Sequence, residues 1–569
     1  MPSHQSQTSG RKLQHGGALL VMLVILVMGI TTVFITSLSS TAIQNRRNHS
    51  SAESLARAKE ALIGYALTYG DTHTAAHGYL PCPDLSGSNG EGSSPGSCGS
   101  SGVHQLGRLP WRTLDLPALF DGSGECLWYA VSGKYKNNPA SSTTMNWDNT
   151  GDLTIYADNG NTIEANEVVA AIIAPGKPLS GNSDRAGSSA PTCGGNYTAA
   201  AYLENDTAHG VNNADGTQGK FILPHEHRDS NGNVTLETND QILFITRQDL
   251  WNAIQKRIAR QAKKCLDDYA ADASNPDHKY PWAVQLSDTT ASPNRTGTLD
   301  VRFGRFPDSP NTGTAGGGSC PASGSNLTTL SSAQISTLNS YINQVSTALT
   351  NYKNSPSSTT RNNLQDAGDN LWDLVKDSPY NLPVGDAIRS SLGYYIKDQC
   401  SDPCYSSIPT FEDRLADAIS EFNGCTGSGG TDSSMPSSWT SISSCNDLVT
   451  SASWPAWRDL LFIQIADGYQ PGAAGSCTTG STCLSISGTG HTNAGSGSYH
   501  AVVVAASKSM SGQDRSVTST LSNFLEGANK TGKTSPPTTT TFETYRPTDT
   551  SYSTVNDLAL CIDGKNNCP

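Results

Sequence analysis

The chain has 569 residues, of which 15% are charged, and its formal net charge is −13. Its length predicts roughly three or four folding units, since domains usually hold about 100–200 residues each. The acidic balance argues against a nucleic acid partner, because phosphate binding needs clustered Lys and Arg.

The N-terminus carries the strongest signal. A basic leader over 1–17 ends in Gly16-Gly17, and the chain is then uncharged over 18–38. As a helix, this run of about 21 residues is roughly 32 Å long, enough to cross a bilayer. A secretory signal peptide has a shorter apolar stretch followed by its small-residue cleavage site, whereas here the glycines come first. The pattern predicts a membrane span that stays on the mature protein; an uncleaved single-pass anchor is the alternative.

The helical period continues beyond the apolar run. No helix breaker occurs before Gly70, so one helix is predicted over 18–70, half membrane anchor and half amphipathic. Its apolar stripe consists of Ala52, Leu55, Ala56, Leu62, Ile63 and Ala66.

This arrangement resembles the type IV pilin superfamily, whose members carry a basic leader, a glycine processing site and a helix that becomes the filament core. The resemblance implies cleavage by a prepilin peptidase after Gly17 or Gly16 and methylation of the new amino terminus, which is Ala18 in the first case. The fifth mature residue is then Met22 or Val21, where most members carry Glu. The missing buried charge favours a position at the filament tip or in initiation.

The remainder of the chain shows one order of landmarks twice, which is typical of a tandem duplication. The first copy covers 71–247 and the second 248–569. Each copy reads as a helix followed by short β-runs, so we predict an α+β fold with two pilin-like domains, each a helix on an antiparallel sheet. The paired landmarks are 107–111 with 303–307, 127–130 with 461–463, 168–174 with 501–506, 177–185 with 508–515, 202–204 with 524–526, and 239–243 with 556–560.

The second copy begins with a helix and contains a helical insertion. The helix is predicted over 249–270, with Thr246 as N-cap and Asp249 three residues later. The insertion, at about 325–425, is either the part particular to this protein or a spacer with its own core. Its predicted helices cover 335–352, 361–376, 384–399 and 410–423.

All 14 cysteines lie after residue 80, which indicates disulfide bonds formed in an oxidising compartment. No CxxC motif occurs, and the nearest histidines lack ligand spacing, which disfavours zinc. The spacing leaves the connectivity open. Pairing in sequence order gives Cys82–Cys98, Cys126–Cys193, Cys265–Cys320, Cys400–Cys404, Cys425–Cys445, Cys477–Cys483 and Cys561–Cys568.

Three patterns typical of functional sites occur in unsuitable surroundings. The segment 92–96 matches GxSxG, but loop residues replace the strand and helix that a nucleophile elbow needs. His225 and His227 share one face of a possible strand, which is more typical of a surface than of a metal site. The loop from Asp84 to Glu91 has only two carboxylates and no calcium-site spacing. We therefore predict no catalytic residue, no metal and no cofactor.

Together, these features favour a minor pilin or pseudopilin-like subunit of a type IV pilus or type II secretion filament, and not an enzyme. Its expected partners are other pilin or pseudopilin subunits, a prepilin peptidase, the inner membrane and a surface or secreted-protein ligand. The expected location is the inner membrane, with a periplasmic ectodomain that reaches the cell surface after assembly. The alternatives are a membrane-anchored periplasmic hydrolase and a static envelope scaffold.

Overall fold

The computed structural model forms two compact units, which divide after Leu250; Gly70–His77 and Thr144–Asp148 also belong to the second. Each unit is described by itself. The structure describes residues 16–86, 89–140, 145–179, 184–228, 231, 234–289, 295–314, 332–355, 357–375, 429–479, 481–488, 498–534, 537–544 and 554–563.

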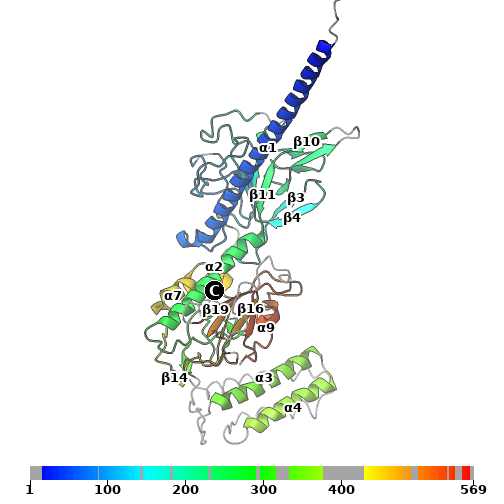
Figure 1. Cartoon of the computed structure of the whole chain (residues 1–569). Helices are drawn as coiled ribbons and strands as arrows, with labels where there is room; N and C mark the ends of the chain where they lie inside the picture. The colour runs from blue at the N-terminus through cyan, green and yellow to red at the C-terminus, as the bar shows by residue number, and fades with distance from the viewer. Residues whose placement is uncertain are drawn as a thin grey trace, which may run out of the picture. The chain divides into compact units, whose positions relative to one another are not determined.

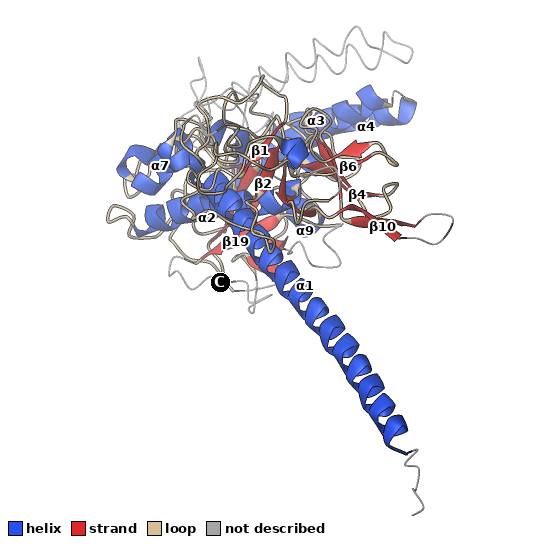
Figure 2. Ribbon diagram, turned by 90° about the horizontal axis from the view of Figure 1, so that it is seen from above, coloured by secondary structure: helices blue, strands red, loops and turns tan. Residues whose placement is uncertain are grey.

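Helix α1 (Gly16–Thr72) is the longest helix in the described part of the chain. Its C-terminal half packs into the first unit, and Leu55, Ala58 and Leu62 are buried. Lys59 Nζ donates a hydrogen bond at 3.0 Å to the backbone oxygen of Phe244, which joins the helix to the last strand of the sheet. Towards its N-terminus, α1 continues as a straight rod beyond the strands of this unit (Figures 1 and 2).

The first unit is built on a four-stranded antiparallel sheet. Its strands, in spatial order, are β1 (Gln105–Arg108), β2 (Trp128–Val131), β5 (Ala170–Ala174) and β11 (Gln241–Ile245). Every residue of β2 and β5 is buried, as is usual for strands covered on both faces.

A smaller sheet encloses the core on one side of the first. It consists of β4 (Ile163–Val168), β3 (Leu153–Tyr156) and β8 (Lys220–Ile222), with β3 and β8 parallel. Trp128, Ile173 and Phe221 belong to the buried cluster between these elements. Four further strands form two hairpins: β6 (Asn205–Asp206) with β7 (Val211–Asn212), and β9 (His225–Arg228) with β10 (Val234–Thr238).

The second unit contains a sheet of the same design. Its antiparallel strands, in spatial order, are β12 (Phe303–Arg305), β15 (Leu461–Ile465), β17 (Ala501–Ala505) and β19 (Leu558–Ile562). Beside it, β16 (Ser485–Gly488) and β18 (Thr541–Thr544) pair in parallel, as β3 and β8 do in the first unit. Short 3-10 helices also correspond, at Ala199–Ala201 and Leu521–Asn523. The landmarks shared by the two copies thus fall on matching elements.

Helix α2 (Arg247–Ala271) begins where the sequence predicts a helix start. Thr246 Oγ1 accepts a hydrogen bond from Asp249 N, and Asp249 Oδ2 accepts one from Thr246 N, each at 3.0 Å. This reciprocal pair is a capping box with Asp in place of Glu. Within the second unit, Gln255 Nε2 of α2 donates to Ala505 O at 2.8 Å and so fixes the helix to β17.

Part of the predicted insertion is described. Helices α3 (Ser332–Asn354) and α4 (Ser358–Val375) pack against each other and correspond to the first two predicted helices. The predicted helices over 384–399 and 410–423 lie outside the described residues. The strands β13 (Gly313–Thr314) and β14 (Gly429–Thr431) pair on either side of the insertion. Among the described residues of this unit, the other short helices are the 3-10 helix η3 (Trp439–Ser441), α7 (Ser443–Thr450), α8 (Trp454–Trp457) and α9 (Gly527–Lys530).

The predicted membrane anchor is wrong. A span requires about 20 consecutive, mostly apolar residues. Among the residues that the structure describes, no helix combines the length and the apolar character needed to cross a membrane. The continuously described side chains of α1 begin at Ala42 and soon include the charged Arg46 and Arg47. This finding overturns the predicted inner-membrane location and the transmembrane part of the predicted fold, while the α+β class agrees with the structure.

Two of the disulfides predicted by pairing in sequence order are wrong, namely Cys265–Cys320 and Cys425–Cys445. Cys265 of α2 bonds to Cys445 of α7, because these two helices lie together, and not to Cys320. Every cysteine in the described ranges is disulfide-bonded, Cys561 included. The other bonds are Cys82–Cys98, Cys126–Cys193 and Cys477–Cys483. The candidates Cys320, Cys400, Cys404, Cys425 and Cys568 lie outside the described residues.

Candidate functional site: Asp206, His209 and His225

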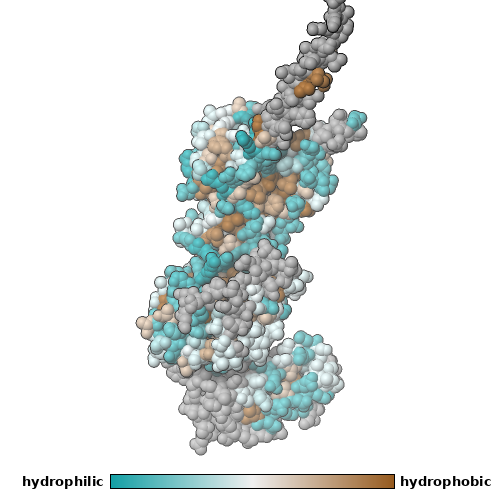
Figure 3. All heavy atoms as spheres, in the orientation of Figure 1, coloured by the Kyte–Doolittle hydropathy of each residue, from teal (hydrophilic) through white to brown (hydrophobic). Residues whose placement is uncertain are grey.

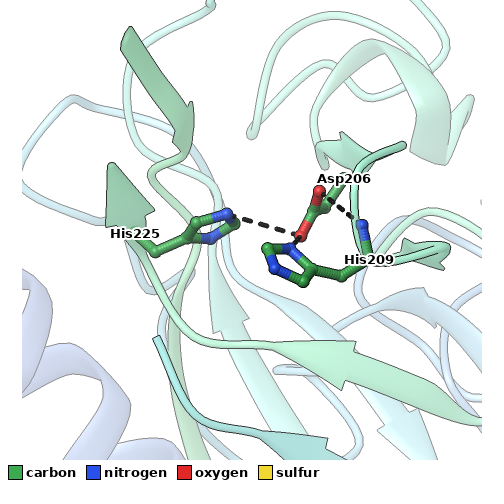
Figure 4. Close-up of side chains that lie close together, drawn as sticks. All are labelled: Asp206, His209 and His225. Atoms are coloured by element: carbon green, nitrogen blue, oxygen red, sulfur yellow. Dashed lines mark hydrogen bonds and ion pairs between the residues drawn. The ribbon is translucent and has the colours of Figure 1, made fainter. Parts of the chain in front are cut away.

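Asp206 lies at the end of β6, and its side chain is completely buried in the first unit. Its Oδ1 accepts hydrogen bonds from Ala208 N at 3.0 Å and His209 N at 3.2 Å. These bonds form an Asx-type turn, which fixes the carboxylate and leaves Oδ2 facing the two histidines. Figure 4 shows this arrangement.

His209 lies in the turn that Asp206 begins. Its Nδ1 lies 2.6 Å from Asp206 Oδ2, and its side chain keeps 22% of its surface exposed. The ring packs on Gly160, where an added Cβ would lie 2.2 Å from the ring Cγ. Gly160 also has a φ of +65°, so this position favours glycine for two reasons.

His225 is the first residue of β9 and approaches Asp206 from the other hairpin. Its Nε2 lies 3.4 Å from Asp206 Oδ2, and its Nδ1 lies 3.1 Å from Thr238 Oγ1. The His209 and His225 rings meet edge to face, with centroids 5.5 Å apart. One carboxylate oxygen and two imidazole nitrogens therefore converge within 4.8 Å of one another.

The sequence pattern indicated that His225 and His227 lie on a surface, but the side chain of His225 is buried. Glu226 is exposed, and the side chain of His227 lies outside the described residues. Asp206 and His209 were missed, although their spacing of three residues across a turn was a usable signal. His225 joins them only through the packing of two hairpins, which no local pattern reveals.

A pair of buried carboxyl groups occurs in each unit. In the first, Asp240 is fully buried beside Glu204, and its Oδ2 accepts hydrogen bonds from Asn213 Nδ2 at 2.9 Å and Glu204 N at 3.0 Å. Burial, and then repulsion from Glu204, raises the pKa of the Asp240 carboxyl well above its usual range. A proton held between the two carboxyl groups relieves that repulsion.

The second unit repeats this arrangement. Asp557 Oδ2 accepts hydrogen bonds from Asn529 Nδ2 and from Glu526 N, both at 3.1 Å. Burial, followed by repulsion from Glu526, raises the pKa of Asp557, and burial also raises the pKa of Glu526. Because both units have the same pair, we interpret it as part of the shared fold and not as a catalytic dyad.

Buried arginines are duplicated as well. In the first unit, the guanidinium groups of Arg108 and Arg185 each lie 4.9 Å from the ring centroid of Tyr202. In the second, Arg305 and Arg515 lie 5.3 and 5.9 Å from the ring of Phe524. Through these cation–π contacts, Arg108 of β1 and Arg305 of β12 each bind the aromatic residue that follows the 3-10 helix of the same unit.

Both carboxylates of the acidic loop accept hydrogen bonds from neighbouring loop segments. Asp84 Oδ2 accepts hydrogen bonds from Gly92 N at 2.7 Å and Tyr197 Oη at 2.9 Å. Glu91 accepts from Thr192 N and Cys193 N, both at 2.7 Å. The two carboxylates thus connect loop segments.

The other predicted sites are described only in part. The GxSxG segment 92–96 forms a loop without a flanking strand or helix, as expected. Gly16, Gly17 and Ala18 form the start of α1, and nothing further is described at these processing positions.

Comparison of the chain with protein-family models, with curated proteins and with solved structures finds no match. Its function is therefore inferred from its own residues.

Proposed function

We propose that the chain is a non-catalytic filament subunit of the type IV pilin class, which assembles through α1 and uses its two units to recognise another protein or a surface. The observation that carries this proposal is the contrast between the two halves of α1. In the C-terminal half, Leu55 and Leu62 are buried in the first unit. Near the other end, four large apolar side chains are 50–76% exposed: Met22, Leu23, Leu26 and Val27.

The exposed side chains form a stripe along α1. Positions 22 and 26, and likewise 23 and 27, are one helical turn apart, so they lie on one side of the helix. Figure 3 shows the resulting hydrophobic patch on the rod. Covering such a stripe stabilises an assembly by about 25 cal/mol for each Å² of apolar surface removed from water. A helix from another subunit has the period that matches this stripe.

The buried polar groups support recognition in preference to catalysis. The carboxylate pairs and arginine–aromatic contacts face inward and occur in both units, so they stabilise the fold. In the described ranges, disulfides close loops in both units, which suits a binding protein in an oxidising compartment.

The test expresses the full chain with a prepilin peptidase and the pilins of its own host. Mass spectrometry gives the amino terminus, and immunoblotting gives the amount of chain in sheared filaments. We expect a mature chain that begins at Gly17 or Ala18 and co-purifies with filaments. The double variant Leu23→Asp/Leu26→Asp should be lost from the filaments.

The matched control is Leu236→Asp, because Leu236 is a comparably exposed leucine, at 43%, on β10. This variant should remain in the filament fraction. An unprocessed amino terminus together with a chain absent from filaments would contradict the proposal.

A further inference from the structure

We propose that Asp206, His209 and His225 form a binding site for a divalent transition-metal ion, and that Zn²⁺ is the ion they fit best. This inference does not depend on the proposed filament function. It rests on the directions of the hydrogen bonds around His225 and on the convergence of three ligand atoms in the first unit.

The tautomer of His225 follows from its neighbour Thr238. The Thr238 hydroxyl donates its proton to Leu223 O at 3.1 Å, so its oxygen accepts from His225 Nδ1, which lies at 3.1 Å. Nδ1 therefore carries a proton. In the neutral ring, Nε2 then presents a lone pair.

That lone pair faces a carboxylate. His225 Nε2 is buried, has no hydrogen-bond partner in the described part of the chain, and lies 3.4 Å from Asp206 Oδ2. Two lone-pair acceptors that face each other at this distance in a buried place repel, and a cation between them removes the repulsion. A proton on Nε2 would give a charge-assisted hydrogen bond, but such bonds are shorter, at about 2.7–2.9 Å.

The spacing suits a small tetrahedral ion. Bonds of about 2.0–2.1 Å to nitrogen and oxygen place tetrahedral ligand atoms about 3.3 Å apart. The 3.4 Å between His225 Nε2 and Asp206 Oδ2 matches this spacing. His209 Nδ1, now 2.6 Å from Oδ2, must move outward and release its proton, and its partly exposed position in a turn permits this movement.

Neighbouring groups already orient the ligands. Two backbone N–H groups hold Asp206 Oδ1, and Thr238 holds His225 Nδ1. Such outer contacts are usual in metal sites, where they fix the tautomer and the direction of the ligand.

The ligand set selects among metals. Two imidazoles and one carboxylate suit Zn²⁺, whereas Ca²⁺ and Mg²⁺ prefer oxygen ligands only. Three protein ligands leave a fourth position for water. The second unit lacks the site, because Gly527 and Ala528 follow Glu526 where Asn205 and Asp206 follow Glu204.

The experiment uses the full chain, stripped of metal and then titrated with ZnCl₂ by isothermal calorimetry. Co²⁺ serves as the spectroscopic probe, since four-coordinate Co²⁺ gives visible absorption bands. We expect binding of one ion at this site and at least tenfold weaker affinity in His209→Ala and in His225→Gln. His209→Ala is the safer variant, because His209 is partly exposed and lies in a turn.

His104→Gln is the matched control, since His104 Nδ1 lies 3.7 Å from Asp152 Oδ2 in the same unit but outside the cluster. It should keep the wild-type affinity. Circular dichroism in the absence of metal separates lost ligands from lost folding. Equal Zn²⁺ affinity in the wild type and in a folded His209→Ala variant would overturn the proposal. So would a His225 that stays doubly protonated by NMR and binds no Zn²⁺ or Co²⁺.

Discussion

Asp240 and Asp557 occupy equivalent positions, each one residue before the last strand of its four-stranded sheet. Each accepts a hydrogen bond from an asparagine side chain and another from the backbone of a buried glutamate. The second carboxylate oxygen of each aspartate is buried and has no hydrogen-bond donor among the described residues. Burial, and then repulsion from the neighbouring glutamate, raises the pKa of each aspartate, so each unit contains a carboxyl group that keeps its proton to a higher pH than an exposed aspartate does.

The first prediction concerns the effect of pH on these pairs. Their raised folded pKa values mean that their stabilising contribution is complete below the unfolded pKa and is lost as pH rises through the folded pKa. Asp240→Asn and Asp557→Asn keep an oxygen acceptor but cannot ionise. Each should raise the free energy of unfolding at pH 8 by about 1–2 kcal/mol and change it little at pH 4.

Urea denaturation of the full chain across this pH range measures that effect. Asp158→Asn is the control, because Asp158 is an exposed carboxylate in the first unit. If Asp240→Asn and Asp557→Asn destabilise the chain equally at both pH values, the carboxyl groups hold no shared proton.

The second prediction concerns Lys533, whose contribution to stability changes with pH in the direction opposite to that of the buried aspartates. Burial lowers the pKa of its amine to about 7, although Nζ donates to Gln464 Oε1 and Thr541 O at 2.9 Å. Because the folded pKa lies below the unfolded value, the penalty for charging the buried amine grows as pH falls from about 10 to about 7. The free energy of unfolding should therefore rise with pH over that interval.

Lys533→Met removes this titration. The slope of stability against pH between 7 and 10 should fall by up to about 1.4 kcal/mol per pH unit relative to the wild type. Lys530→Met is the matched control, since Lys530 is an exposed lysine on the neighbouring α9. Parallel pH profiles for Lys533→Met and the wild type would show that the amine is not perturbed.

The third prediction compares two disulfides. Cys265–Cys445 closes a sequence separation of 180 residues and Cys477–Cys483 one of 6. Chain entropy then predicts that replacing both cysteines by serine costs about 5 kcal/mol for the first bond and about 2 kcal/mol for the second. Guanidinium denaturation of the two double variants gives both values. A larger loss for the short loop would mean that the entropic account fails here.

The fourth prediction concerns the start of α2. Thr246→Ala removes the oxygen that accepts from Asp249 N and should lower the free energy of unfolding by about 1 kcal/mol. Thr246→Ser keeps the hydroxyl and should cost much less. The midpoint of thermal unfolding compares the two variants, and equal midpoints would mean that the cap contributes nothing.

Local patterns predicted the elements that local physics determines. The capping residues Thr246 and Asp249 located α2 correctly. The predicted apolar stripe of α1 was right only in part, because Leu55, Leu62 and Ala66 are buried whereas Ala52 and Ala56 are exposed and Ile63 is half-buried. Repeated landmarks such as Leu203-Glu204 and Leu525-Glu526 occupy equivalent places, each shortly after the corresponding 3-10 helix of its unit.

Local sequence patterns could not predict contacts between residues that are far apart in the sequence. The bond from Cys265 to Cys445 depends on two helices that meet far apart in sequence. Asp206, His209 and His225 meet only because two hairpins pack together. The prediction of a membrane anchor was wrong for another reason. It depended on the hydropathy of one sequence segment, and none of the described helices has the length and apolar character of a membrane span.

The pairing of Thr314 with Gly429 has a consequence for engineering and for evolution. The chain leaves and re-enters the second unit at neighbouring points, so whatever is placed between them adds only a loop to that unit. Domains inserted at such junctions are tolerated best. The second unit is therefore suited to carry different inserted domains at this point. One insertion, with its binding specificity, can be exchanged for another while the two duplicated units stay unchanged.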